Sequence, residues 1–152
     1  MEKIYETAYA KINLGLDVLG KRSDGYHEVR MVMQSVGLSD AVEIEEGEGL
    51  VVETDHSGLA GGPDNLAWKA AELLARCCGK IPNVHIRLNK KIFLAAGLAG
   101  GSSDAAAVMR GLSRLWQLDL TAPELEKLAA ELGSDIPFCI TGGTALAEGR
   151  GE

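Results

Sequence analysis

Two stretches near the start of the chain alternate apolar and polar side chains with the period of a β-strand. Over Tyr5–Leu19 the apolar positions fall on one face: Ala8, Ala10, Ile12, Leu14 and Leu16. Lys11 and Asn13 fall on the other face, so we expect these two side chains to point the same way. A mid-strand lysine is usually solvated, and that interpretation stays open beside a functional one. Glu28–Val36 alternates less regularly, which is typical of a strand covered in part on both faces.

Shorter patterns predict the remaining elements. Ala41–Glu45 and Leu50–Glu53 indicate a second hairpin around a Glu-Gly-Glu-Gly turn. Helical spacing and stop signals predict helices from Asn65 to Gly79, over 103–117, and from a Thr121 cap to about Leu132. Further strands are expected over 84–88 and 143–147. The prediction is an α+β domain of 152 residues, with helices packed on one face of a mostly antiparallel sheet.

The stretch Leu94–Ala107 reads LAAGLAGGSSDAAA and combines glycines, two serines and an alanine run. Small residues let a backbone approach a ligand, and serines followed by alanines mark a helix start. A helix N-terminus suits a phosphate. The pattern is not a Walker A loop, because Ser102 and Ser103 stand where Gly-Lys is needed, and Ala99 breaks the dinucleotide fingerprint. A tight strand-to-helix turn without a ligand is the alternative interpretation.

Composition narrows the possible partners. The net charge of −7 argues against general nucleic-acid binding, although it does not exclude a nucleotide held by local groups. The three cysteines, Cys77, Cys78 and Cys139, match no zinc spacing and are expected to be reduced thiols. No signal peptide or membrane-length apolar run is visible, so we expect a cytoplasmic protein with no membrane partner and no metal held by protein ligands alone.

Three further motifs flank the glycine loop. They are Ala-Lys-Ile-Asn-Leu at 10–14, Asp-Gly-Tyr-His at 24–27 and Gly-Ser-Asp-Ile-Pro at 133–137. Together with the loop they resemble the GHMP kinases, a family that includes galactokinase, homoserine kinase and mevalonate kinase. Asp-Gly-Tyr-His is most similar to the branch that uses ATP to phosphorylate a cytidyl diphosphate substrate in the non-mevalonate route to isoprenoids. The resemblance implies the family's N-terminal domain, which has a ribosomal protein S5 domain 2-like fold.

The resemblance also implies roles for matched positions. Lys11 and Asp135 would be the catalytic pair, the lysine neutralising phosphate charge and the aspartate acting on the acceptor hydroxyl. A Mg²⁺ ion would accompany ATP. The cytidyl substrate would be held by Asn13, Tyr26 and His27. ATP would be bound by Leu94, Ala95, Ala96, Gly97, Leu98, Ala99, Gly100, Gly101, Ser102 and Ser103, with Asn65 near the adenine.

Length raises an alternative to an active enzyme. Members of this family are about twice as long as this chain, and they carry a second, ferredoxin-like domain. The resemblance therefore implies that residues 1–152 form the N-terminal ATP-binding and catalytic domain, and that the C-terminal GHMP domain is absent. A nucleotide-binding module without efficient turnover, or a purely structural α+β domain, is the alternative. An uncovered apolar face would favour self-association.

Overall fold

The fold was analysed in a computed structural model, which describes residues 3–21, 23, 27–56, 58–92, 100–142 and 144–151. In chain order the elements are β1 (Lys3–Lys21), β2 (His27–Glu46), β3 (Val51–Thr54), α1 (Leu66–Cys78), β4 (Val84–Asn89), α2 (Gly100–Leu115), α3 (Ala122–Ala129), α4 (Ile136–Thr141) and β5 (Thr144–Gly151). Among the described residues, no helix is long and apolar enough to cross a membrane.

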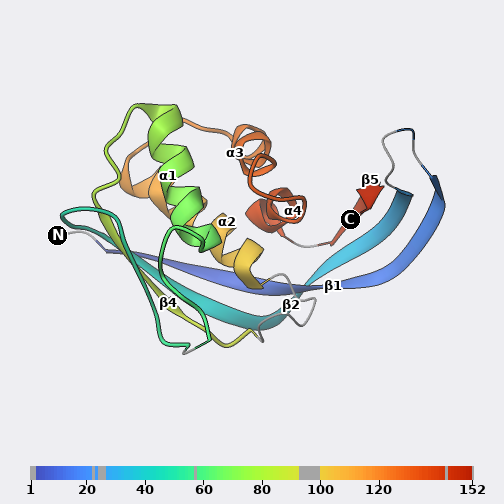
Figure 1. Ribbon diagram of the computed structural model, residues 1–152, viewed down its shortest axis with the longest axis horizontal. Helices are drawn as coiled ribbons and strands as arrows, with labels where there is room; N and C mark the ends of the chain where they lie inside the picture. Colours follow the sequence, from blue (N-terminus) through green and yellow to red (C-terminus); the bar gives the residue numbers. More distant parts are fainter. Residues whose placement is uncertain are drawn as a thin grey trace.

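The long strand β2 organises the sheet. One edge of β2 pairs with β1 in antiparallel fashion. Its other edge pairs with β4 over 41–46 and with β5 over 27–34, and both ladders are antiparallel. β3 adds to β4 in parallel, which gives the order β1-β2-β4-β3 with β5 beside β2. The helices cover one face of this sheet (Figure 1), so the predicted α+β class is confirmed.

The predicted hairpin between residues 41–45 and 50–53 is wrong. β2 runs unbroken through the first of these segments, and β4 lies between β2 and β3. The chain crosses over β4 at Gly47, where an added Cβ would lie 2.6 Å from the His85 ring. Gly47 N–H donates to the Asn83 carbonyl at 3.1 Å. The chain therefore passes across β4 at Gly47 and does not turn back to pair with β2.

The helix predictions hold in part. Asn65 caps α1, and Gly79 ends it with a left-handed φ of 66°, which glycine adopts without strain. Thr121 caps α3, but this helix ends at Ala129 instead of reaching Leu132. α2 begins at Gly100, earlier than the expected Ser103. The short helix α4 is absent from the sequence prediction, because six residues are too few to show helical periodicity.

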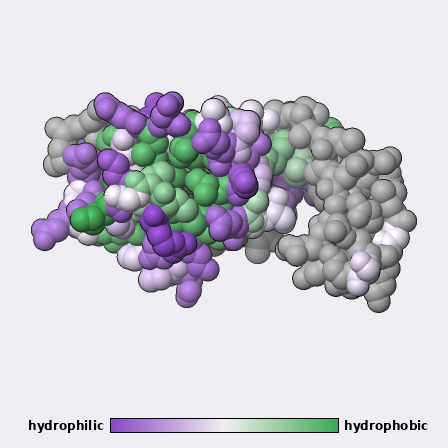
Figure 2. Space-filling model, turned by 90° about the horizontal axis from the view of Figure 1, so that it is seen from above, coloured by the Kyte–Doolittle hydropathy of each residue, from purple (hydrophilic) through white to green (hydrophobic). Residues whose placement is uncertain are grey.

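Small side chains let the helices lie close to the sheet. Alanines of α1 and α2 are fully buried against the aliphatic face of β2 and β4. Gly111 of α2 marks the tightest approach, since an added Cβ would lie 2.5 Å from Ile44 Cδ1. The opposite side of the helix layer shows hydrophobic residues among hydrophilic ones in Figure 2. The core is thus aliphatic and alanine-rich, as the composition indicates.

Side chains of α2 cover the outer edge of β1. Arg114 and Arg110 donate to the carbonyls of Tyr5 and Thr7, both at 3.0 Å, and Ser103 donates to the carbonyl of Tyr9 at 2.6 Å. Arg110 also pairs with the carboxylate of Glu6 at 2.7 Å. Its remaining donors reach the carbonyls at the end of α4, those of Cys139 and Ile140. One guanidinium therefore holds β1, α2 and α4 together.

We expect Arg110→Lys to lower the free energy of unfolding by about 2 kcal/mol, because an ammonium group cannot reach the acceptors that the guanidinium fork joins. Denaturant unfolding measures the change. Arg76→Lys, at an exposed position near the end of α1, is the matched control and should be neutral. Equal stabilities of the two variants would contradict the bridging role.

Candidate functional site

Three predicted site residues come together at the centre of the molecule. Lys11 of β1 is buried, with 5% of its surface exposed, and its Nζ lies 3.6 Å from Asp135 Oδ2. The same Nζ donates to Asn13 Oδ1 at 3.4 Å. Asp135 directly precedes α4 and makes no side-chain cap to that helix, so its carboxylate stays available. The arrangement pairs a fixed cation with a partly exposed anion.

An irregularity in the sheet turns Lys11 inward. Tyr9 pairs with Ser39 and Lys11 pairs with Ser35, so β2 carries extra residues between the two pairs. Such a bulge bends the strand and re-aims side chains. Tyr9 remains half exposed while Lys11 is buried, although plain alternation puts both on one face. The interpretation of Lys11 as a solvated strand lysine is therefore wrong, and its predicted proximity to Asn13 is confirmed.

The first turn of α2 presents small residues and is bonded to β1 through Ser103, at Tyr9. Gly101 is exposed, and an added Cβ would meet only Leu66 Cδ1, at an ordinary 3.5 Å. At Gly100 an added Cβ would lie 3.0 Å from Ile92 Cγ2, so this position is packed against the chain before the loop. Ser102 is half-buried, and the hydroxyl of Ser103 donates a hydrogen bond to the Tyr9 carbonyl of β1. First-turn N–H groups of a helix lack intrahelical acceptors and are free to bind an anion.

The side chain of Asn65 is used by the local fold. Its Oδ1 accepts from Ala67 N–H at 2.8 Å, and its Nδ2 donates to the Ala60 carbonyl at 2.9 Å. Both polar groups thus fix the start of α1. A role near the adenine stays a prediction.

Several predicted site residues lie outside the described residues. These are Tyr26 and the loop residues Leu94, Ala95, Ala96, Gly97, Leu98 and Ala99. His27 is the first residue of β2, where its backbone pairs with Lys21. Asn13 is exposed next to Lys11. The substrate and ATP roles assigned to these positions stay predictions.

The structure also contains a buried cluster of three charged residues that was not predicted from the sequence, Asp40, Lys90 and Asp104. Lys90 Nζ lies 2.5 Å from Asp40 Oδ2 and 2.5 Å from Asp104 Oδ2. All three side chains are essentially inaccessible to solvent. Among the described residues, Asp104 Oδ1 has no hydrogen-bond partner. An aspartate inside a run of small apolar residues was the available signal, because a carboxylate on a buried helix face needs a cation.

Burial and the neighbouring carboxylate raise the pKa of Asp104 to about 8. Burial also acts to raise the pKa of Asp40, but hydrogen bonds from Asp104, from backbone N–H groups and from Lys90 outweigh it and hold this pKa below its ordinary value. Burial acts to lower the pKa of Lys90, whereas the two carboxylates raise it and prevail. At neutral pH the cluster therefore consists of a protonated Asp104, an ionised Asp40 and a charged Lys90.

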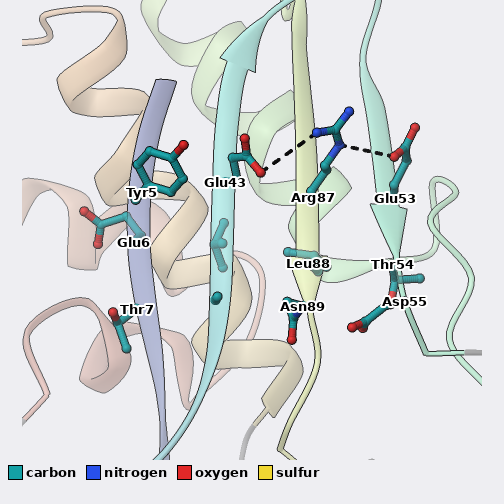
Figure 3. Close-up of a pocket in the computed structure, with 12 residues that line it drawn as sticks. Tyr5, Glu6, Thr7, Glu43, Glu53, Thr54, Asp55, Arg87, Leu88 and Asn89 are labelled. Atoms are coloured by element: carbon teal, nitrogen blue, oxygen red, sulfur yellow. Dashed lines mark ion pairs between the residues drawn. The ribbon is translucent and has the colours of Figure 1, made fainter. Parts of the chain in front are cut away.

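The residues that the structure describes form cavities beside the sheet. One of about 300 Å³ adjoins the start of α2, and its lining includes Tyr9, Ser103 and Arg110. The larger, about 540 Å³, lies on the sheet face away from the helices (Figure 3). There Arg87 lies between Glu43 and Glu53, at 4.0 and 3.5 Å. No predicted site residue lines this larger cavity, and its exposed ion row is typical of a solvated face.

Comparison with known proteins supplies the family. The sequence model described as the GHMP kinases N terminal domain matches residues 65–143, more than half of the chain. The chain belongs to the GHMP kinase family. This membership confirms the resemblance that the sequence motifs indicated.

Relatives place the chain more closely within the GHMP kinases. Proteins named 4-diphosphocytidyl-2-C-methyl-D-erythritol kinase from Caldanaerobacter subterraneus subsp. tengcongensis and Synechococcus sp. are 51% identical over 150 residues and 56% identical over 146 residues. These alignments cover 99% and 95% of this chain but 52% and 47% of those proteins. The chain therefore spans about half the length of the curated relatives it matches.

Solved structures share the fold. A crystal structure of 4-(cytidine 5'-diphospho)-2C-methyl-D-erythritol kinase has a TM-score of 0.84 at 39% identity, over 96% of this chain and 52% of that chain. The mevalonate kinase of Methanococcus jannaschii has a TM-score of 0.72 at 15% identity, over 97% of this chain and 54% of that chain. The second likeness shows the fold alone. Both support the predicted GHMP-kinase N-terminal architecture.

The pKa of Asp104 predicts a pH dependence of stability. Between about pH 4 and 8 the native state keeps a proton that the unfolded state loses, so the free energy of unfolding falls as pH rises through this window. Asp104→Asn removes the group. The stability of the unsubstituted chain relative to this variant should therefore decline from pH 5 to 8, by at most about 1.4 kcal/mol per pH unit, and level off above.

Denaturant unfolding of both proteins at several pH values measures this difference, in which the titrating groups that do not interact with Asp104 cancel. Parallel pH profiles would show that Asp104 is ionised in the native state at neutral pH.

Proposed function

We propose that this chain is the ATP-binding and catalytic domain of a kinase that phosphorylates the 2-hydroxyl of 4-diphosphocytidyl-2-C-methyl-D-erythritol in isoprenoid precursor biosynthesis by the non-mevalonate pathway. The observation that carries the proposal is the meeting of Lys11 with Asp135 at 3.6 Å, on the strand to which the first turn of α2 is bonded through Ser103 and Tyr9. The names of relatives at 51–56% identity support the choice of substrate.

The chemistry suits the pair. Phosphoryl transfer depends on positioning and on charge stabilisation more than on covalent chemistry. A buried Lys11 held by Asn13 and Asp135 has little freedom, so its ammonium is preorganised to neutralise charge that develops on the γ-phosphate. The more exposed carboxylate of Asp135 can reach a substrate hydroxyl, orient it and accept its proton late in the reaction.

In this proposal the ATP phosphates lie on Gly100, Gly101, Ser102, Ser103 and the preceding Leu94–Ala99, where the α2 dipole favours negative charge. Asn65 lies near the adenine, and Asn13, Tyr26 and His27 hold the cytidyl group. The described residues contain no group of three or more His, Cys, Asp or Glu side chains arranged for a metal. In the proposal a Mg²⁺ ion would accompany ATP and supply positive charge to its phosphates.

The share of its relatives that this chain covers affects the turnover that we expect of it. Because the chain spans about half of its relatives, we propose that their remaining half supplies a second wall over the substrate, which excludes water. The alternative is that this chain by itself is a nucleotide-binding module without efficient turnover. Self-association through the apolar area in Figure 2, and a cytoplasmic location where ATP is available, belong to the same proposal.

Gly101→Val tests the phosphate site. The structure has room for the added Cβ, and the larger side chain would narrow the space that we propose for the phosphates at the first turn of α2. We expect ATP affinity to fall at least about 10-fold, with little change in the melting temperature. Gly37→Val is the control, since Gly37 is an exposed glycine with open space around it. Calorimetric titration that finds unchanged ATP affinity in folded Gly101→Val would remove the phosphate assignment.

Asp135→Asn tests the chemistry, because it keeps the size of the side chain and removes the base. In the full-length protein, kcat should fall about 100-fold or more while ATP affinity changes much less, and Lys11→Met should behave alike. Asp119→Asn, at an exposed position, is the matched control. A coupled ADP-release assay gives kcat, and near-normal turnover of Asp135→Asn would reduce Asp135 to a turn residue. The same assay on the 152-residue chain separates the kinase from the nucleotide-binding module.

A further inference from the structure

We propose that Lys90 is a positioning residue for phosphate binding: its ammonium, held between Asp40 and Asp104, ties the first turn of α2 to the sheet. This inference rests on the proposed function. It adds three residues that make no expected contact with ATP, substrate or the reacting atoms. Their effect would be exerted through the placement of Gly100–Ser103.

Lys90 is the point where three elements meet. It follows the last residue of β4, and its N–H donates to Asp55 Oδ1 at 2.8 Å, just beyond the end of β3. Its side chain reaches Asp40 of β2 on one side and Asp104 of α2 on the other, both at 2.5 Å. Backbone and side chain are thus held by carboxylates from separate parts of the chain.

Asp40 controls where the chain leaves the sheet. The β2–β4 ladder ends at the pair Ala41–Asn89. Immediately past it, Asp40 Oδ1 accepts from the N–H groups of Lys91 and Ile92, at 2.6 and 2.8 Å. The carboxylate therefore takes over as hydrogen-bond acceptor at the point where the strand partner ends. This fixes residues 90–92 on the side of the chain that precedes the glycine loop.

Asp104 holds the other side. It lies one helical turn after Gly100, and an added Cβ at Gly100 would be 3.0 Å from Ile92 Cγ2 and 3.4 Å from Lys90 Nζ. The first turn of α2 therefore rests directly on the residues that Asp40 fixes. A displacement of Lys90 would therefore change the support of Gly100, the first residue of α2.

The presence of charged residues in this cluster is better explained by the fixed arrangement that they impose than by a gain in folding stability. Replacing a buried ion pair with apolar side chains of similar volume is often neutral or stabilising, so stability alone does not require these charges. Short charge-assisted hydrogen bonds hold their partners in one arrangement. Misplacement of binding groups by about 1 Å can cost up to about 100-fold in rate, which makes such a constraint valuable beside a phosphate.

The experiment compares a neutral triple variant, Lys90→Met with Asp40→Asn and Asp104→Leu, with the unsubstituted chain. The triple variant leaves no buried charge unpaired, and the amide introduced by Asp40→Asn keeps an acceptor for the N–H groups of Lys91 and Ile92. ATP and adenosine are titrated separately, and hydrogen exchange is followed over 103–106. Lys91→Met, at the exposed neighbouring lysine, is the matched control. Asp104→Asn is the conservative variant, because its amide oxygen still accepts from Lys90.

We expect the triple variant to bind ATP about 10-fold or more weakly, to bind adenosine within about 2-fold of the original, and to exchange faster over 103–106. Lys91→Met and Asp104→Asn should retain ATP affinity. Unchanged ATP affinity and exchange in the folded triple variant overturn the tether, and so does an equal loss of ATP and adenosine binding, which indicates a general packing role.

The experiment separates failure of the tether from failure of the proposed function. If the triple variant does not fold, the same measurements on Asp40→Asn decide, because this substitution weakens the hold on Lys90 while keeping an acceptor for the backbone of Lys91. An unsubstituted chain that binds no ATP overturns the proposed function, whereas the exchange comparison reports on the tether itself. The two failures are therefore distinguishable.

Discussion

The arrangement of the whole domain depends on the way the backbone of β2 is shared. One of its edges bonds to β1, while the other bonds first to β4 and then to β5. A single edge can serve two strands only if the first departs before the second arrives. Asp40 stands at that departure and supplies acceptors to Lys91 and Ile92. Residues 90–92 thus leave the sheet at a position set by β2 itself, and α2 begins against the same place.

Local signals predicted local structure. The extended conformation of β1, the Asn65 cap and the Gly79 stop each depend on neighbours a few residues apart, and these three predictions are confirmed. The predicted alternation of β1 holds only as far as Ala10, since Lys11 is buried and Leu14 is exposed. The hairpin after β2 failed because strand pairing is decided by distant residues: β4 takes the place beside β2 that turn chemistry assigned to β3. The cluster around Lys90 was missed for the same reason, since its two carboxylates come from β2 and α2.

In the candidate site, too, contacts between near neighbours were predictable from the sequence and contacts between distant residues were not. Spacing placed Lys11 beside Asn13, but only the resemblance to GHMP kinases joined Lys11 to Asp135, a residue from the far end of the chain. Alternation also gave no hint that Lys11 is buried, because the bulge that re-aims it lies in β2, between Ser35 and Ser39, and not in the strand that carries Lys11. Sequence patterns thus named the chemical groups, and the sheet irregularity decided their orientation.

The covering of β1 by α2 also limits how copies of this domain can associate. Arg114, Arg110 and Ser103 occupy the carbonyls of alternate residues from Tyr5 to Tyr9, which are the acceptors that an incoming strand would need. Along this stretch the sheet is closed to growth by strand addition, the route by which unprotected edges aggregate. Any assembly that involves this side must therefore proceed through packed faces rather than through a continuous intermolecular sheet.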